Sequence, residues 1–158
     1  MPVQKPALDP QSVEALSRSA YPEPYRSRVL PREVRALGDA LGLTRIGINM
    51  ARLLPGRESS MRHWHTHEDE FVYILEGELV LRTDGGEQVL RAGMCAGFAA
   101  GCADGHQLIN RSSRPATYLV VSNRDPEDTA HYADPEVDLV WSPAHARLKM
   151  TRRDGTPW

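Results

Sequence analysis

The sequence contains only two cysteines, and this scarcity excludes one class of fold. Cys95 and Cys102 form neither a CxxC redox pair nor the framework of a small disulfide-rich secreted domain. Unpaired cysteine usually behaves as a small core hydrophobe, so we expect two free, buried thiols. The cysteines therefore point to packing rather than to redox chemistry.

Long apolar runs are also absent. The longest, such as FVYIL at 71–75 and YLVV at 118–121, are far shorter than the ~20 residues that a membrane-spanning helix needs. The first residues, MPVQKPALDP, lack the basic start and the unbroken apolar stretch of a secretory signal. We expect a cytosolic protein with no membrane partner.

Charge of one sign is not concentrated anywhere in the chain. The formal net charge is -2, charged residues make up 25% of the sequence, and no run of five like charges occurs. Nucleic acid and anionic membranes are therefore poor candidates for a partner. The length of 158 residues suits a single domain with its own core.

Proline sets the beginning of the chain apart. Six of the 12 prolines lie in the first 31 residues, so we expect residues 1–42 to form an extended, partly irregular arm. A short helix over 11–18 fits the sequence. The segment PREVRALGDALG at 31–42 could begin a helix at its proline, but Gly38, Gly42 and a weak apolar stripe leave an extended structure open.

From Leu43 onward the chain changes to short segments of β-type composition separated by turns. Ile46, Ile48 and Met50 alternate onto one face, and the Asp-Gly pair at 84–85 carries a hairpin signal. Many short strands with regularly spaced turns favour an all-β sandwich or barrel. Further strands are expected at 71–76, 78–83, 87–90, 93–98, 107–110, 117–122, 138–141 and 147–151.

Three histidines alternate in the stretch RHWHTHEDEF. Successive side chains of a strand point to opposite faces, so His63, His65 and His67 would share one face. Glu70 follows His65 by five positions and would face away on a continuous strand. We therefore expect a turn at 66–69, after which the Glu70 carboxylate swings back across a hairpin toward the histidines.

The segment GHQLIN supplies a fourth candidate ligand, His106, at the head of another expected strand. Three imidazoles and one carboxylate suit a divalent first-row metal (zinc, iron, manganese, nickel or cobalt), whereas calcium and magnesium prefer oxygen ligands. In a six-coordinate shell, four protein ligands leave two positions for water or a bidentate substrate, so the ion could act as a Lewis acid. We predict one such ion per chain, held by His63, His65, Glu70 and His106.

These residues resemble the two-part histidine motif of the cupin superfamily of small β-barrels. The first part, His-x-His, four residues, a glutamate, six residues and a glycine, runs from His63 to Gly77. The second part contains a glycine, a histidine and an asparagine, and runs from Gly93 to Asn110. Ala99 stands where proline is usual and the gap before the histidine is longer, but both departures leave the four ligands intact.

The resemblance implies a double-stranded β-helix, or jelly-roll, barrel at 43–125. Residues 1–42 would then be the N-terminal arm, and residues 126–158 a C-terminal extension packed on the barrel. Cupins that this chain resembles often dimerise through edge strands and an exchanged arm, so we expect a homodimer. Among the residues around the motif, we expect an exposed or supporting role for His67 and core or interface positions for Trp64, Phe71 and Tyr73.

Cupins include oxygenases, decarboxylases and sugar or sugar-phosphate isomerases, so the resemblance implies a range of reactions. We expect a metal-dependent enzyme that acts on a small polar molecule; the alternative is a non-catalytic binder or sensor whose metal only shapes a ligand pocket. A transcription factor is disfavoured, because no helix-turn-helix segment is evident at either end. No general acid or base stands out beyond the metal shell, and His67, Tyr73, Cys95 and Gln107 are candidates only through their proximity in the chain.

Overall fold

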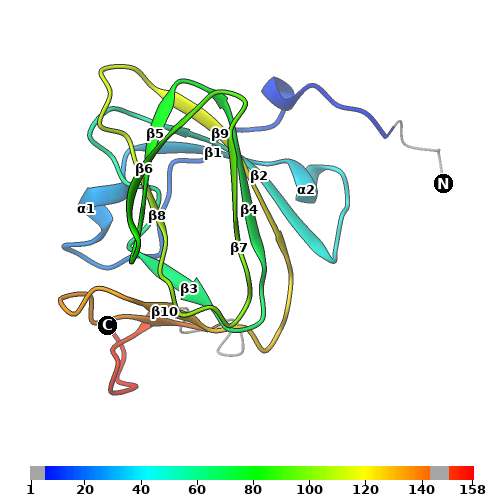
Figure 1. Ribbon diagram of the computed structural model, residues 1–158. Coiled ribbons are helices and arrows are strands. Elements are labelled where there is room, and N and C mark those ends of the chain that lie inside the picture. Colours follow the sequence, from blue (N-terminus) through cyan, green and yellow to red (C-terminus); the bar gives the residue numbers. More distant parts are fainter. Residues whose placement is uncertain (1–5, 143–149) are drawn as a thin grey trace.

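Short strands in three antiparallel sheets make up most of the computed structural model, which describes residues 6–142 and 150–158 (Figure 1). The helical segments are η1 (Pro10–Ser12), α1 (Arg26–Val29) and α2 (Leu37–Ala40). The strands are β1 (Arg32–Ala36), β2 (Ile46–Leu53), β3 (His63–His65), β4 (Glu70–Glu76), β5 (Glu78–Thr83), β6 (Gly86–Arg91), β7 (Cys95–Phe98), β8 (Gln107–Ile109), β9 (Ala116–Asn123), β10 (Ala130–Tyr132), β11 (Val140–Trp141) and β12 (Met150–Thr151). The fold is nearly all β, as predicted.

The main core lies between two sheets that face one another (Figure 1). The five-stranded sheet has the order β1-β2-β9-β4-β7, and the three-stranded sheet has the order β6-β5-β8. Side chains alternate along β4, so Val72 and Ile74 are buried in the core cluster to which Leu79 and Leu81 of β5 also belong. This arrangement is consistent with the predicted jelly roll, although the strands form separate sheets and not one closed barrel.

A third sheet lies across one end of the two facing sheets (Figure 1). Its order is β12-β11-β10-β3, so strands from the C-terminal part of the chain pair with the strand that carries the alternating histidines. A second buried cluster packs beside this sheet and joins it to the N-terminal segment. Its members are Tyr21, Tyr25, Val29, Met61, Tyr132, Val137 and Leu139.

The N-terminal segment is more strand-like than helical. The undecided segment 31–42 forms β1, which pairs with β2, followed by the short helix α2. The helix expected over 11–18 is reduced to η1, because the backbone of Leu16 pairs with Val34 of β1 through hydrogen bonds of 2.9 and 3.0 Å. Pairing with a sheet edge thus overrides local helix propensity. None of the helices in the described residues combines the length and the apolar content needed to cross a bilayer.

Most expected strands are present with shifted ends. The strand expected at 93–98 begins only at Cys95, and the strand expected at 138–141 is limited to β11. Of the strand expected at 147–151, residues 147–149 lie outside the described residues, and the last two form β12. Strand β10 was not expected from the sequence.

The prediction of buried thiols is wrong. Cys95 and Cys102 are both exposed. Cys95 lies on β7, an edge strand, and is paired with Tyr73 on the outer face of the sheet. Phe71 and Tyr73 are 41% and 37% exposed on the same face, so they are not core residues. An interface role for these two aromatic side chains stays a prediction.

Gly77 is the point at which the chain passes from one facing sheet to the other. It separates β4 from β5 and has a φ of +80°, a value that favours glycine. A Cβ at this position would also lie 2.9 Å from the Ala116 Cα atom. The glycine at the end of the first motif therefore permits the crossover that follows β4.

Candidate metal centre

Three separate elements position the four predicted ligands. Strand β3 carries His63 and His65 on one face, as their alternation predicts, and Trp64 on the other, where its ring stacks on His131 of β10 at a centroid distance of 4.6 Å. Glu70 is the first residue of β4, in the five-stranded sheet. His106 directly precedes β8. The site therefore lies where all three sheets approach one another.

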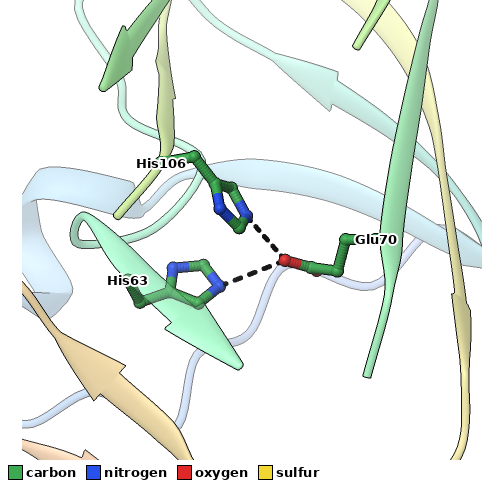
Figure 2. A group of neighbouring side chains, drawn as sticks. All are labelled: His63, Glu70 and His106. Atoms are coloured by element: carbon green, nitrogen blue, oxygen red, sulfur yellow. Dashed lines mark hydrogen bonds and ion pairs between the residues drawn. The ribbon is translucent and has the colours of Figure 1, made fainter. Parts of the chain in front are cut away.

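Three imidazoles converge on a single oxygen atom of the fourth side chain, Glu70. Oε2 of Glu70 lies 2.6 Å from Nε2 of His106, 3.3 Å from Nε2 of His65 and 3.5 Å from Nε2 of His63. Figure 2 shows the imidazoles of His63 and His106 and the carboxylate of Glu70 pointing toward one another from separate segments of the chain. Two ligands that each bind a metal ion at about 2.1 Å and at a right angle lie ~3 Å apart, so these separations fit a shared ion.

The route by which Glu70 reaches the histidines differs from the predicted one. The chain leaves β3 at Thr66 and enters β4 at Glu70, as expected, but the two strands do not form a hairpin. Strand β3 pairs with β10, whereas β4 pairs with β7 and β9. The carboxylate thus approaches the histidines from a different sheet, and the predicted hairpin is wrong.

His106 is held in place by its backbone and by an aromatic ring. Its backbone exchanges two hydrogen bonds with that of His63, at 2.9 and 3.1 Å. A Cβ on the preceding Gly105 would lie 2.6 Å from the Ala133 Cβ atom, so this close approach requires glycine. The Phe98 ring stacks on the imidazole at a centroid distance of 3.6 Å and an angle of 5°.

Hydrogen bonds on the far side of two imidazoles set their orientation. Nδ1 of His63 lies 2.8 Å from the carbonyl oxygen of Met61, which can only accept, so Nδ1 carries the proton. Nδ1 of His65 lies 2.6 Å from Oδ2 of Asp128. In the neutral state of each ring, Nε2 then presents a lone pair toward the centre, as a metal ligand must.

The charges of the cluster also suit a cation. Burial opposes ionisation of Glu70, but hydrogen bonds from His106, His63 and His65 hold its pKa well below the usual range. Burial likewise lowers the pKa of His65, but hydrogen bonds and charge from Glu70 and Asp128 outweigh it and raise this pKa to about 9. For His106, burial dominates and lowers the pKa. Two groups of donor atoms lie close enough together to hold a divalent ion: His63, Glu70 and His106 form the first, and His65, Glu68 and Asp128 form the second.

Sequence reasoning missed Asp128, which is 0% exposed. Its Oδ1 atom accepts hydrogen bonds from the backbone N–H groups of His67 and Glu68, at 2.9 and 3.2 Å. The His67 side chain itself is exposed, and its Nδ1 atom lies 2.8 Å from Oγ1 of Thr66. Asp128 belongs to no motif that the sequence displays, so nothing in the local pattern could have assigned it.

Two cavities flank the centre. The first, of about 280 Å³, includes His63, His65 and Glu70 in its lining, together with Tyr21 and Arg32. The second has a volume of about 240 Å³ and is lined by Trp64, His65, Glu68, Gly97, Phe98, Ala99, Cys102, Asp104 and His106. Each candidate ligand therefore lines at least one cavity that a small molecule could enter.

Comparison with known proteins identifies the family of this chain. The model of the cupin domain family matches residues 49–122. A crystal structure of a sugar phosphate isomerase from a cupin superfamily, from Silicibacter pomeroyi, is 42% identical to this chain. The match covers 97% of this chain and 96% of that chain, with a TM-score of 0.87. The chain belongs to the cupin superfamily.

Two further proteins that this cupin is similar to have names that refer to polyketides. The tetracenomycin polyketide synthase protein TcmJ of Streptomyces glaucescens is 29% identical over 143 residues, which is 89% of this chain and 93% of that protein. The structure of the polyketide cyclase RemF from Streptomyces resistomycificus has a TM-score of 0.65 at 16% identity and covers 89% of this chain and 91% of that chain. At this identity the RemF structure shows a likeness of fold alone.

Proposed function

We propose that this cupin is a metal-dependent isomerase of a small polar substrate, of the sugar phosphate class. The observation that carries the proposal is the convergence of three imidazole nitrogens on one oxygen of Glu70 beside a cavity. The ion would be held by His63, His65, Glu70 and His106. When bound, it would supply Lewis-acid polarisation of a substrate oxygen.

The size of the cavities favours a small substrate. The volumes of about 280 and 240 Å³ lie at or below the lower end of typical ligand pockets, which span roughly 300–1,000 Å³. A sugar phosphate suits such a space better than a polycyclic polyketide does. The relative from Silicibacter pomeroyi, described as a sugar phosphate isomerase, supports the same substrate class.

The protein's own side chains would bind and orient the substrate in the first cavity. Tyr21 and Tyr132 line its wall, and burial raises the pKa of both phenols. The hydroxyl groups therefore keep their protons at neutral pH; Tyr132 donates its proton to the Tyr21 oxygen, which leaves the Tyr21 proton available to a substrate. The Ser60 side chain, whose Oγ lies 3.2 Å from Nδ1 of His63, adds a further polar group next to the centre.

The test is an isomerisation assay in heavy water. Metal-stripped protein is reloaded with zinc, iron, manganese, nickel or cobalt in turn and incubated with aldose and ketose phosphates. Interconversion through proton abstraction next to the carbonyl introduces solvent deuterium, which proton NMR detects even when little product accumulates. We expect turnover only with metal, loss of turnover in His65→Ala, and retention in the control His67→Ala, whose side chain is exposed.

The non-catalytic alternative gives a different result. A sensor or storage cupin would bind one of these ligands tightly in the metal-loaded form and return it unchanged, without deuterium, with every metal. That outcome would replace the isomerase proposal. A cytosolic location and a homodimer, both expected from the sequence, stay predictions.

A further inference from the structure

Arg32 brings a positive charge into the cavity that contains three of the candidate metal ligands. It is the first residue of β1 and the one arginine or lysine among the described residues that line this cavity. Its Nη1 and Nη2 atoms donate to the carbonyl oxygens of Ser59 and Arg18, at 2.7 and 3.4 Å. These contacts tether the guanidinium group beside the cavity.

The remaining nitrogen of that guanidinium group has nothing to bind. Nε of Arg32 is buried and has no hydrogen-bond partner within residues 6–142 and 150–158. A buried donor without an acceptor is costly, particularly when it is charged, and such groups are rare in folded proteins. An oxyanion at the part of the cavity wall that Arg32 forms would offer the guanidinium group an acceptor for a charge-assisted hydrogen bond.

Tyr21, which also lines this cavity, carries a second hydrogen-bond donor. The hydroxyl oxygen of Tyr21 accepts hydrogen bonds from the Met61 backbone N–H at 3.3 Å and from the Tyr132 hydroxyl at 3.2 Å. Both lone pairs of that oxygen are then used, so its own proton can only be donated. No acceptor for it occurs in the described part of the chain, and Tyr21 is 7% exposed.

The two cavities differ in charge, and the difference selects one of them for an anion. The second cavity is lined by the carboxylates of Glu68 and Asp104 and, among described residues, by no arginine or lysine. The first is lined by Arg32 and Tyr21 together with His63, His65 and Glu70. An anionic ligand therefore meets an arginine in the first cavity and, in the second, two carboxylates without an arginine or lysine among the described residues.

We propose that Arg32 and Tyr21 form an oxyanion subsite that binds the charged end of the substrate, a phosphate or a carboxylate, while the rest of the molecule extends toward His63, His65 and Glu70. The inference rests on the proposed function, because it assumes that the first cavity holds the substrate. The inference assigns a role in substrate specificity to the N-terminal segment. Both Arg32 and Tyr21 lie in this segment, outside the histidine motif.

The subsite is tested by titration calorimetry with inorganic phosphate and with acetate. The full-length protein is used in metal-loaded and metal-stripped forms, since the stripped form shows binding that does not depend on an ion. We expect Arg32→Gln to weaken binding of the preferred anion about tenfold or more in both forms, and Tyr21→Phe to weaken it less. Arg32→Lys, which keeps the charge, should retain part of the affinity. Whether phosphate or acetate shows the larger loss identifies the anion.

Arg52→Gln is the matched control, because Arg52 lies on the neighbouring strand β2 and is exposed. Thermal unfolding and elemental analysis of metal show whether each variant stays folded and loaded. If Arg32→Gln does not fold, Arg32→Lys and Tyr21→Phe carry the test. Anion binding that is absent from the wild type, or equal in the wild type and the folded variants, overturns the subsite.

The kinetic arm separates failure of the subsite from failure of the proposed function. We expect Arg32→Gln to raise KM about tenfold or more for a phosphorylated sugar and much less for the unphosphorylated sugar. Isomerisation that is equally fast in Arg32→Gln leaves the isomerase proposal intact and overturns the subsite. Arg32-dependent anion binding without any isomerisation supports the subsite and contradicts the isomerase proposal.

Discussion

Asp128 accepts a hydrogen bond of 2.6 Å from Nδ1 of His65, although the two residues are 63 positions apart in the chain. The carboxylate is completely buried and also receives two backbone N–H groups from the segment that follows β3. A buried carboxylate of this kind fixes both the rotamer and the protonated nitrogen of an imidazole. The orientation of one candidate ligand is thus controlled from the C-terminal part of the chain.

Substituting Asp128→Asn tests this control. The amide keeps the shape of the side chain but removes its charge, so we expect metal affinity to fall roughly 10- to 100-fold, as for other residues that orient metal-bound histidines. Competition with a chromogenic chelator measures the change. Glu127→Gln is the control, because that neighbouring side chain is exposed. Equal affinities of the Asp128 variant and the wild type would show that His65 needs no such support.

The identity of the ligands can be checked by elemental analysis. We expect about one transition-metal ion per chain in the wild type and a sharp loss in His63→Ala or His65→Ala, because each removes one of four converging donors. His67→Ala should lose much less, since its exposed ring contacts Thr66 and lies outside the cluster. An equal loss from all three variants would mean that the ligand set is wrong.

Metal binding should release a proton from His65. In the metal-free protein its pKa is raised to about 9, so the ring is protonated at pH 7.5 and must lose a proton before Nε2 can bind an ion. Affinity should therefore increase as the pH rises toward 9 and decrease below it. Calorimetry at pH 7.5 in buffers of different ionisation enthalpy should give about one proton released per ion. A binding enthalpy that is independent of the buffer would contradict this.

The outer face of β4 is the surface on which we expect a second copy of the chain to bind. Phe71, Tyr73 and Leu75 are 41%, 37% and 42% exposed in a row along this strand. Tyr73→Lys places a charge in the middle of the row, so we expect it to shift light-scattering mass from dimer to monomer. Val89→Lys, at an exposed apolar position on β6, is the control. A light-scattering mass of the wild type equal to that of a monomer would contradict the prediction.

Deleting the first 30 residues is a less suitable test of the dimer. The deletion would remove Tyr21, Tyr25 and Val29, which pack in the second core cluster of the same chain. Any loss of association could then result from loss of the fold. The point substitution on β4 avoids this ambiguity.

Periodicity allowed the shared face of His63 and His65 to be predicted from the sequence, because alternation on a strand follows from backbone geometry. The convergence of Glu70 and His106 was also expected, but the hairpin between β3 and β4 was not correct. Which strands pair is a tertiary property: β10, whose backbone partners β3, is far away in the sequence and has no distinctive pattern. Local composition could not predict that pairing.

Exposure was the other property that the sequence did not determine. Cys95 is apolar enough for a core, but its strand is the last in the five-stranded sheet and its side chain points outward. Asp128 shows the opposite case, in which a charged residue is buried because two N–H groups and an imidazole surround it. Both outcomes depend on neighbours that only the folded chain supplies.

The pairing of β3 with β10 also determines how short a working version of this protein can be. The region matched by the cupin family ends at residue 122, and a fragment ending there would still contain all four candidate ligands. The fragment would lack Asp128 and the whole of strand β10, which pairs with β3. It would therefore also lack Tyr132 of β10, whose hydroxyl donates a hydrogen bond to Tyr21. A protein shortened to the region of the motif would thus contain the four candidate ligands without the residues that orient them.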